Sequence, residues 1–174
     1  VLFDGKNGTP LSIMDSIEIT ILRTGAATAA AAKRLARPDA DTVTICGCGN
    51  QGRVQLRALK LVLPALCKAY AYDASADAAL TYAAAMAAEL GIEVEAAPDL
   101  EAATAASAMI VTCTPSRKPY LMRDFVRPGT FVAAVGADSP DKRELDPSIL
   151  AEAKVVVDIL DQSAGVGELH HALA

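Results

Sequence analysis

The chain has 174 residues, of which 52% are hydrophobic, and a formal net charge of −5 at pH 7. That length and apolar content are enough for one domain with a substantial core. The acidic balance, with no basic stripe to offset it, argues against nucleic acid as a partner. The longest apolar runs are far shorter than the roughly 18 residues that a membrane span needs, so no membrane association is expected either.

The first 36 residues predict a strand and turn followed by one long helix. The strand and turn fall within residues 1–10, and the helix is expected over residues 13–36, where isoleucines recur every four residues from Ile13. An alanine run from 26 to 32 favours helix and permits close packing. Pro38 and its polar neighbours end this helix.

The most informative stretch covers residues 42–52. Thr42 to Cys46 predicts a β-branched strand that runs directly into G-x-G-x-x-G, and a helix-forming run follows. A second apolar run ends on Asp73, which lies 24 residues after Gly49. Strand, glycine turn, helix, strand and acid, in this order, are what a dinucleotide-binding unit requires. S-adenosylmethionine is the alternative ligand, because its sites use a similar fold with an acid after the second strand.

Each residue of the glycine loop has an expected role in binding the cofactor. Gly47 permits the tight turn, Gly49 lets the backbone approach a pyrophosphate, and Gly52 lets the helix pack close to the strand. The helix N-terminus, at Asn50 and Gln51, would point unpaired N–H groups at the phosphates.

Asp73 predicts which dinucleotide is bound. Its carboxylate would accept hydrogen bonds from a ribose 2′-OH, and its charge would repel a 2′-phosphate. Residues 73–77 contain no basic side chain that could hold such a phosphate. The expected cofactor is therefore NAD, in preference to NADP.

From residue 42 onward, strand and helix signals alternate, which predicts an α/β fold with a Rossmann-type doubly wound parallel sheet. Strands are expected near 42–46, 67–72, 92–95, 108–113, 130–135 and 154–158, and helices over 51–63, 75–90 and 98–105. Asp146 and Pro147 begin a further helical turn. Ligand-binding groups should lie at the carboxyl ends of the strands.

Two loops at those carboxyl ends carry further candidates. The loop after the fourth strand offers the Thr112 and Thr114 hydroxyls to the cofactor's ribose or nicotinamide amide, unless it is only a polar turn. The loop after the fifth strand places Gly136 beside the cofactor and Asp138 at the mouth of the cleft. A carboxylate there could hold a substrate ammonium or activate water, and a turn or helix-cap aspartate is the alternative.

Arg23 lies in the apolar surface of the long helix. A charged side chain in that setting suits an anionic partner such as a substrate carboxylate or a phosphate. The alternative is an arginine whose stem packs on the helix while its guanidinium reaches solvent.

The remaining polar residues predict no chemistry. Three of the four cysteines lie in or beside predicted strands and are expected to pack as small apolar residues, and free thiols fit a reducing cytoplasm. Adjacent His170 and His171 would point in different directions on a helix, so no metal site is expected. Asp141, Glu144 and Asp146 are expected to be turn and cap residues.

Several segments together carry a resemblance to one family. They are L-R-T-G-A-A at 22–27, G-C-G-N-Q at 47–51, T-C-T-P-S-R-K-P at 112–119, V-G-A-D-S-P-D-K-R-E-L-D at 135–146 and G-E-L at 167–169. In combination they are quite specific, and the chain resembles the ornithine cyclodeaminase, archaeal alanine dehydrogenase and mu-crystallin family over nearly its whole length. The match is nearest to the alanine dehydrogenase-like branch.

The resemblance implies an enzyme that acts on the Cα–N bond of a small amino acid or a cyclic imine. It makes Arg23 the ligand of the substrate carboxylate and Asp138 the catalytic acid/base, and it places Thr24 among the cofactor-binding residues. In the alanine dehydrogenase branch, a hydride passes from Cα to the nicotinamide, and water then displaces ammonia. In an ornithine cyclodeaminase, the side-chain amine attacks instead, and the hydride returns to give proline. A ketimine reductase, or a crystallin that binds nucleotide without catalysis, is a further alternative.

The family also has a second lobe, with a catalytic lysine and a further arginine that no residue here matches. By resemblance, residues 1–37 link to that lobe, residues 38–160 form the NAD-binding domain, and residues 161–174 return toward the lobe. The long helix would lie at the interface with the lobe, and the full-length protein would be a homodimer. We therefore expect the 174-residue chain to bind NAD but to turn over poorly or not at all.

Overall fold

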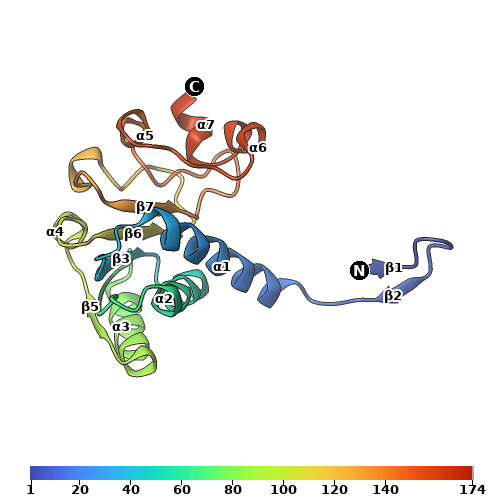
Figure 1. Cartoon of the computed structure of the whole chain (residues 1–174), viewed down its shortest axis with the longest axis horizontal. Helices are drawn as coiled ribbons and strands as arrows, with labels where there is room; N and C mark the ends of the chain where they lie inside the picture. The colour runs from blue at the N-terminus through green and yellow to red at the C-terminus, as the bar shows by residue number, and fades with distance from the viewer. Residues whose placement is uncertain (174) are drawn as a thin grey trace.

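The structure, a computed structural model, describes residues 1–173 and is built on a five-stranded parallel sheet (Figure 1). The strands are β3 (Thr42–Cys46), β4 (Lys68–Tyr72), β5 (Glu93–Ala96), β6 (Met109–Thr112) and β7 (Phe131–Ala134). Their order across the sheet is β5-β4-β3-β6-β7, and every pairing is parallel. The predicted α/β class with a Rossmann-type sheet is confirmed.

Helices cover both faces of this sheet. They are α1 (Ile17–Leu35), α2 (Asn50–Val62), α3 (Ala76–Leu90), α4 (Leu100–Ala105), α5 (Pro147–Glu152), α6 (Leu160–Gly165) and α7 (Glu168–Leu173), with a 3-10 turn η1 (Arg123–Phe125). Within residues 1–173, none of these helices combines the length and apolar character needed to cross a bilayer.

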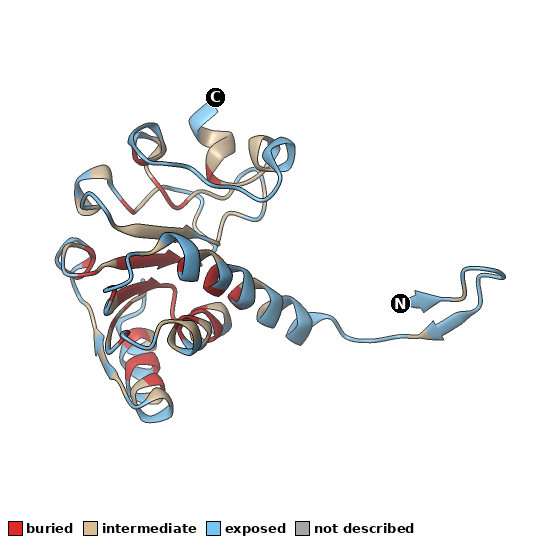
Figure 2. Cartoon of the chain, in the orientation of Figure 1, coloured by how far each residue is buried: buried red, intermediate tan, exposed pale blue. Residues whose placement is uncertain are grey.

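Two core clusters hold the layers together, one on each face of the sheet. The larger cluster joins α1, α2 and α3 to the sheet, through side chains such as Leu56 of α2 and Tyr82 of α3. The smaller cluster joins α4 and α5 to the opposite face, around Leu100, Ile110 and Ile149. Figure 2 shows the buried residues concentrated in the central strands and in the helix faces that pack on them.

The long helix α1 lies directly against α2 because its buried face is made of small residues. Gly25, Thr28, Ala29 and Ala32 are the buried residues of α1. A Cβ added at Gly25 would lie 2.5 Å from Cγ1 and 3.2 Å from the carbonyl oxygen of Val54. The glycine of the R-T-G-A-A segment therefore permits a close helix–helix approach.

The central strands end in register at one edge of the sheet. Cys46 pairs with Tyr72 on one side and with Thr112 on the other, and Thr112 in turn pairs with Ala134. The loops that follow β3, β4, β6 and β7 therefore meet at the same edge, which is where open parallel sheets bind their ligands.

The prediction of a strand at 154–158 is wrong. Residues 154–157 have no regular structure, and Val155, Val156 and Val157 are 42%, 57% and 36% exposed. A strand needs a neighbouring ladder to pair its backbone and a face to bury, and this run has neither within residues 1–173. Its β-branched composition alone did not decide its structure.

Residues 1–16 form an arm that extends away from the sheet (Figure 1) and is mostly exposed (Figure 2). In this arm, β1 (Leu2–Phe3) and β2 (Pro10–Ser12) pair antiparallel, which confirms the strand and turn expected there. The long helix begins at Ile17 and not at residue 13; Ser16 is its N-cap, and the Ile17 N–H donates to Oδ1 of Asp15 at 2.8 Å.

Candidate functional site

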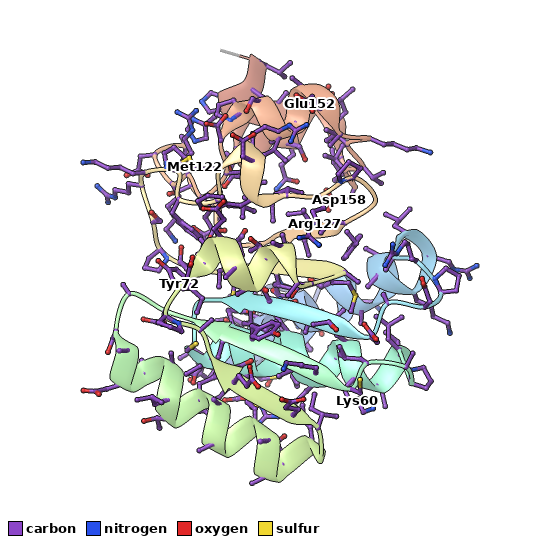
Figure 3. The ribbon with its side chains drawn as sticks, turned by 90° about the vertical axis from the view of Figure 1, so that its left-hand side faces the viewer. Lys60, Tyr72, Met122, Arg127, Glu152 and Asp158 are labelled. Atoms are coloured by element: carbon purple, nitrogen blue, oxygen red, sulfur yellow. The ribbon has the colours of Figure 1, made fainter. Side chains whose placement is uncertain are left out.

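Two glycines make the turn after β3 possible. Gly47 has a φ of 105°, which side chains rarely adopt, and an added Cβ would lie 2.9 Å from the Cys113 carbonyl oxygen. Its N–H donates to the carbonyl of Tyr72 at 2.8 Å, and Tyr72 marks this edge of the sheet in Figure 3. A Cβ on Gly52 would lie 2.1 Å from the Gly47 carbonyl oxygen, so α2 packs on the loop only because residue 52 has no side chain.

The third glycine of the motif faces open space. Gly49 is the N-cap of α2, and an added Cβ there would meet no atom within 4 Å. Within residues 1–173, no side chain accepts a capping hydrogen bond at this helix end, so the N–H groups of Asn50 and Gln51 have no side-chain acceptor. Because Gly49 has no side chain, a pyrophosphate could come close to this uncapped helix N-terminus. The N–H groups and the helix dipole would stabilise its negative charge.

Asp73 follows β4 and lies beside this loop. Its Oδ2 accepts a hydrogen bond from the Cys48 N–H at 2.8 Å, and its Oδ1 accepts one from the Ser75 N–H at 3.0 Å. These bonds fix the carboxylate, and each oxygen keeps a lone pair for a further donor. The arrangement therefore suits the hydroxyls of a ribose bound next to the glycine loop.

Thr114 and Gly136 come together at the other half of the edge. A Cβ on Gly136 would lie 2.4 Å from both the Thr114 carbonyl oxygen and Oε2 of Glu144. The hydroxyl and the N–H of Thr114 both donate to Oε1 of Glu144, at 2.6 and 2.7 Å. Thr112, by contrast, is fully buried in β6, and its hydroxyl has no partner within residues 1–173. That hydroxyl is closed off from the surface on which a cofactor would lie.

Asp138 lies two residues beyond Gly136, in the loop after β7. Its side chain is 73% exposed, and its Oδ1 accepts a hydrogen bond from Nζ of Lys142 at 2.6 Å. The carbonyl oxygen of Lys142 in turn lies 2.8 Å from Nε2 of His171. An accessible carboxylate in this place can bind an ammonium group or exchange a proton, and its catalytic role stays a prediction.

Arg23 and Thr24 lie on α1. Arg23 is exposed and forms no ion pair within residues 1–173, so its guanidinium is free to meet an anion. The hydroxyl of Thr24 donates to the Thr20 carbonyl at 2.7 Å, inside the helix. No hydrogen bond or ion pair of the described residues joins either side chain to Asp138 or to the glycine loop, so their roles also stay predictions.

Three of the four cysteines surround the glycine loop as neutral thiols. Burial, and next the Asp73 carboxylate, raises the pKa of Cys48 to about 12. Burial likewise raises the pKa of Cys46 and of Cys113. Protonated thiols are poor nucleophiles, so these side chains pack as apolar groups. Within residues 1–173, no group of three or more potential ligands is placed to hold a metal ion.

The sequence did not predict that two carboxylates, those of Glu144 and Glu168, would be buried. Glu144 was expected to be a turn residue, but it is fully buried. Glu168 is also buried, and its carboxylate accepts hydrogen bonds from the N–H groups of Glu144 and Leu145. Asp146 does cap α5, as expected, by accepting from the Ser148 N–H at 2.9 Å. The segment K-R-E-L contains Glu144, but no pattern of neighbouring residues there predicts that this side chain is buried.

A shallow hollow of about 210 Å³ lies away from this edge, lined by Arg37, Ser107 and Arg127 among others. It is placed where β3, β6 and β7 begin, whereas ligands of open parallel sheets bind where the strands end. The candidate site is therefore the open edge formed by the glycine loop, Asp73 and the loops after β6 and β7.

The fold and this edge define a protein of the Rossmann class. More specifically, the chain matches the ornithine cyclodeaminase/mu-crystallin family over residues 1–173, and it belongs to that family.

Relatives of known name agree with this assignment. The alanine dehydrogenase of Archaeoglobus fulgidus is 40% identical over 174 residues, which cover 100% of this chain and 53% of the relative. The structure of an archaeal alanine dehydrogenase dimer with bound NAD matches with a TM-score of 0.90 at 40% identity, covering 98% of this chain and 52% of the other. The Δ1-pyrroline-2-carboxylate reductase of Thermococcus litoralis, solved with NADH and L-proline, matches with a TM-score of 0.89 at 33% identity, covering 98% and 53%.

The family spans more than one reaction. Other relatives are named iminosuccinate reductase, in Paracoccus denitrificans, and ornithine cyclodeaminase, in Agrobacterium fabrum. The relatives are thus oxidoreductases and cyclodeaminases that act on amino acids and imines. The chain spans about half the length of the curated relatives it matches.

Proposed function

We propose that this chain binds NAD(H) and serves in an oxidoreductase that acts on the CH–NH2 group of a small L-amino acid, in the manner of an alanine dehydrogenase. The observation that carries the proposal is the unit made by the glycine loop and Asp73, joined by the Cys48 N–H bond to the carboxylate at 2.8 Å. The similarity to archaeal alanine dehydrogenase, at 40% identity in both the curated sequence and the solved structure, supports the amino-acid substrate.

Each half of the edge has its part in holding the dinucleotide. The N-terminal N–H groups of α2 bind the pyrophosphate, and Asp73 accepts the hydroxyls of the adenosine ribose. The loops after β6 and β7, with Thr114 and Gly136, face the nicotinamide half. NAD, when bound, takes a hydride from the amino acid or returns one to an imine.

The substrate would be held by charge. The Arg23 guanidinium, which has no carboxylate partner within residues 1–173, binds the substrate carboxylate. The exposed Asp138 carboxylate binds the ammonium and exchanges a proton there or with a water molecule. Both assignments follow the family resemblance, residue by residue.

An ornithine cyclodeaminase is the second candidate, and the Agrobacterium fabrum relative of that name, 30% identical, favours it. The two reactions differ in their redox balance. A dehydrogenase accumulates NADH as the amino acid is oxidised, whereas a cyclodeaminase returns the hydride and releases ammonia without net NADH. A ketimine reductase would consume NADPH, and a non-catalytic crystallin-like protein would bind nucleotide and change no amino acid.

The first test is a titration of the 174-residue chain with NADH and, separately, NADPH, followed by nicotinamide fluorescence and calorimetry. We expect saturable NADH binding that is at least about tenfold tighter than NADPH binding, because Asp73 repels the 2′-phosphate. Tighter binding of NADPH would favour the ketimine reductase branch. Binding of neither dinucleotide would contradict the proposal.

A further inference from the structure

Glu144 is a fully buried carboxylate that joins two loops of the candidate site. Its Oε1 accepts hydrogen bonds from the Thr114 N–H at 2.7 Å, the Thr114 hydroxyl at 2.6 Å and the Tyr120 hydroxyl at 2.8 Å. Its Oε2 accepts one from the Gly136 N–H at 2.9 Å. One side chain therefore bridges the backbone after β6 and the backbone after β7.

The environment of Glu144 shows why this bridge is specific. A buried carboxylate is costly unless donors surround it. No lysine, arginine or histidine forms an ion pair with Glu144 within residues 1–173, so hydrogen bonds alone stabilise it. A buried network of this kind is most stable when every member is hydrogen-bonded, and it therefore favours one relative position of the two loops.

A second carboxylate fixes the backbone that carries Glu144. Oε1 of Glu168 accepts from the Glu144 N–H at 2.7 Å, and Oε2 accepts from the Leu145 N–H at 3.2 Å. The Glu144 carbonyl oxygen accepts from the N–H groups of Tyr120 and Leu121, at 2.9 and 3.1 Å. The position of Glu144 is thus set from α7 on one side and from the segment after β6 on the other.

We propose that Glu144 is a positioning residue of the candidate site, which locks the loops after β6 and β7 into a preformed surface for the nicotinamide half of the dinucleotide. The inference rests on the proposed function. In this sheet the strand order reverses between β3 and β6, so the β3–β4 half takes the adenosine portion and the β6–β7 half takes the remainder. Glu144 acts on the second half alone.

The chemistry of an amide makes this role testable. In Glu144→Gln, the side chain keeps its length but has one acceptor oxygen, and the other position becomes an NH2 donor. It can accept from the Thr114 N–H or from the Gly136 N–H, but not from both. The variant should therefore release one loop from the other while leaving the volume of the side chain unchanged.

A control variant removes the charge of an exposed glutamate elsewhere in the chain. Glu152, on α5, has a 59% exposed side chain and pairs with Arg123, and Figure 3 shows it far from Tyr72 at the site edge. Glu152→Gln makes the same change of charge but alters no hydrogen bond to Thr114 or Gly136, because the partner of Glu152 is Arg123. Tyr120→Phe is a milder second variant, because it removes one hydroxyl donor and keeps both backbone bonds to Glu144.

The experiment compares two ligands on the 174-residue chain. ADP probes the β3–β4 half alone, and NADH probes both halves, each by calorimetry. Amide hydrogen exchange at Thr114, Gly136 and the β3 residues reports the loops and the core separately. Glu144→Gln should weaken NADH about tenfold and ADP less than about twofold, because one bond to a charged group is lost on the nicotinamide side only. Exchange at Thr114 or Gly136 should accelerate at least about tenfold, with β3 unchanged.

Each other outcome has a definite meaning. Unchanged NADH affinity in Glu144→Gln would overturn the positioning role, and so would an equal loss for ADP and NADH, which would mark a general structural role. If Glu144→Gln does not fold, Tyr120→Phe is the deciding variant. Its affinity for NADH alone is expected to fall about threefold. An NADH affinity equal to that of the unmutated chain would overturn the role. If the unmutated chain binds neither ligand, the proposed function falls and this inference with it.

Discussion

The two halves of the candidate site are built by different means. In the β3–β4 half, backbone geometry shapes the site, because Gly47 and Gly52 allow close contacts that any side chain would block. In the β6–β7 half, a buried side chain shapes the site, because Glu144 connects Thr114 to Gly136 through its two carboxylate oxygens. The first half is thus a rigid steric turn, and the second is an assembly that depends on a hydrogen-bond network. Substitutions should therefore affect the two halves in different ways.

The largest expected effect is that of Gly52→Ala in the steric half. The new Cβ would be placed 2.1 Å from the Gly47 carbonyl oxygen, which is backbone and cannot move freely. We expect the free energy of unfolding to fall by about 3 kcal/mol and NADH binding to be lost. Urea denaturation measures the first and calorimetry the second.

Gly49→Ala is the matched control for this prediction, since a Cβ there meets no atom within 4 Å. It should leave stability nearly unchanged and weaken dinucleotide binding only. If Gly52→Ala were as stable as Gly49→Ala, the steric account of this half would be wrong.

Asp73→Ser removes the charge of the same half, together with the carboxylate that accepts from the Cys48 N–H. Serine can still form a hydrogen bond but no longer repels a 2′-phosphate, so we expect the preference for NADH over NADPH to narrow about tenfold. Separate titrations of the variant with the two dinucleotides give the ratio. Asp77→Ser, an exposed neighbour on α3, is the control and should leave the ratio unchanged. An unaltered ratio in Asp73→Ser would contradict the assigned role of this carboxylate.

In the network half, Glu168→Gln should destabilise the chain by about 1–3 kcal/mol, because an amide cannot accept from both the Glu144 and Leu145 N–H groups. Burial raises the pKa of Glu168, so the folded chain holds this proton at a higher pH than the unfolded chain does. The Glu168 contribution to stability is therefore greatest below its usual pKa and falls as pH rises through the raised pKa.

Urea unfolding of both chains between pH 4 and pH 7 checks this sign. The stability deficit of Glu168→Gln should shrink as pH rises. A deficit that instead grew with pH would show that the ionised carboxylate is favoured by the fold.

The smallest expected effect is at the exposed end of this half. The Lys142–Asp138 ion pair is open to solvent on the Asp138 side, which is 73% exposed. Exposed pairs contribute little, so Lys142→Gln should change the free energy of unfolding by about 0.5 kcal/mol or less. Thermal unfolding of the variant against the unmutated chain measures it. A much larger loss would mean that Lys142 belongs to the network around Glu144 and Glu168.

The sequence by itself determined the steric half. The alternating strands and helices predict a parallel sheet, and the positions of Gly47, Gly52 and Asp73 predict a dinucleotide turn, because these features depend on local backbone conformation and short spacing. The Asp146 cap of α5 was predictable for the same reason.

Only the tertiary structure decided the network half. Glu144, Glu168 and their donors come from four separate stretches of chain, and no local pattern distinguishes a buried carboxylate from a turn carboxylate. The fate of residues 154–158 likewise depended on whether a partner strand was present, and not on their valines. Local backbone conformation depends on neighbouring residues, whereas the burial of a carboxylate and the pairing of a strand depend on which distant segments lie next to each other in the folded chain.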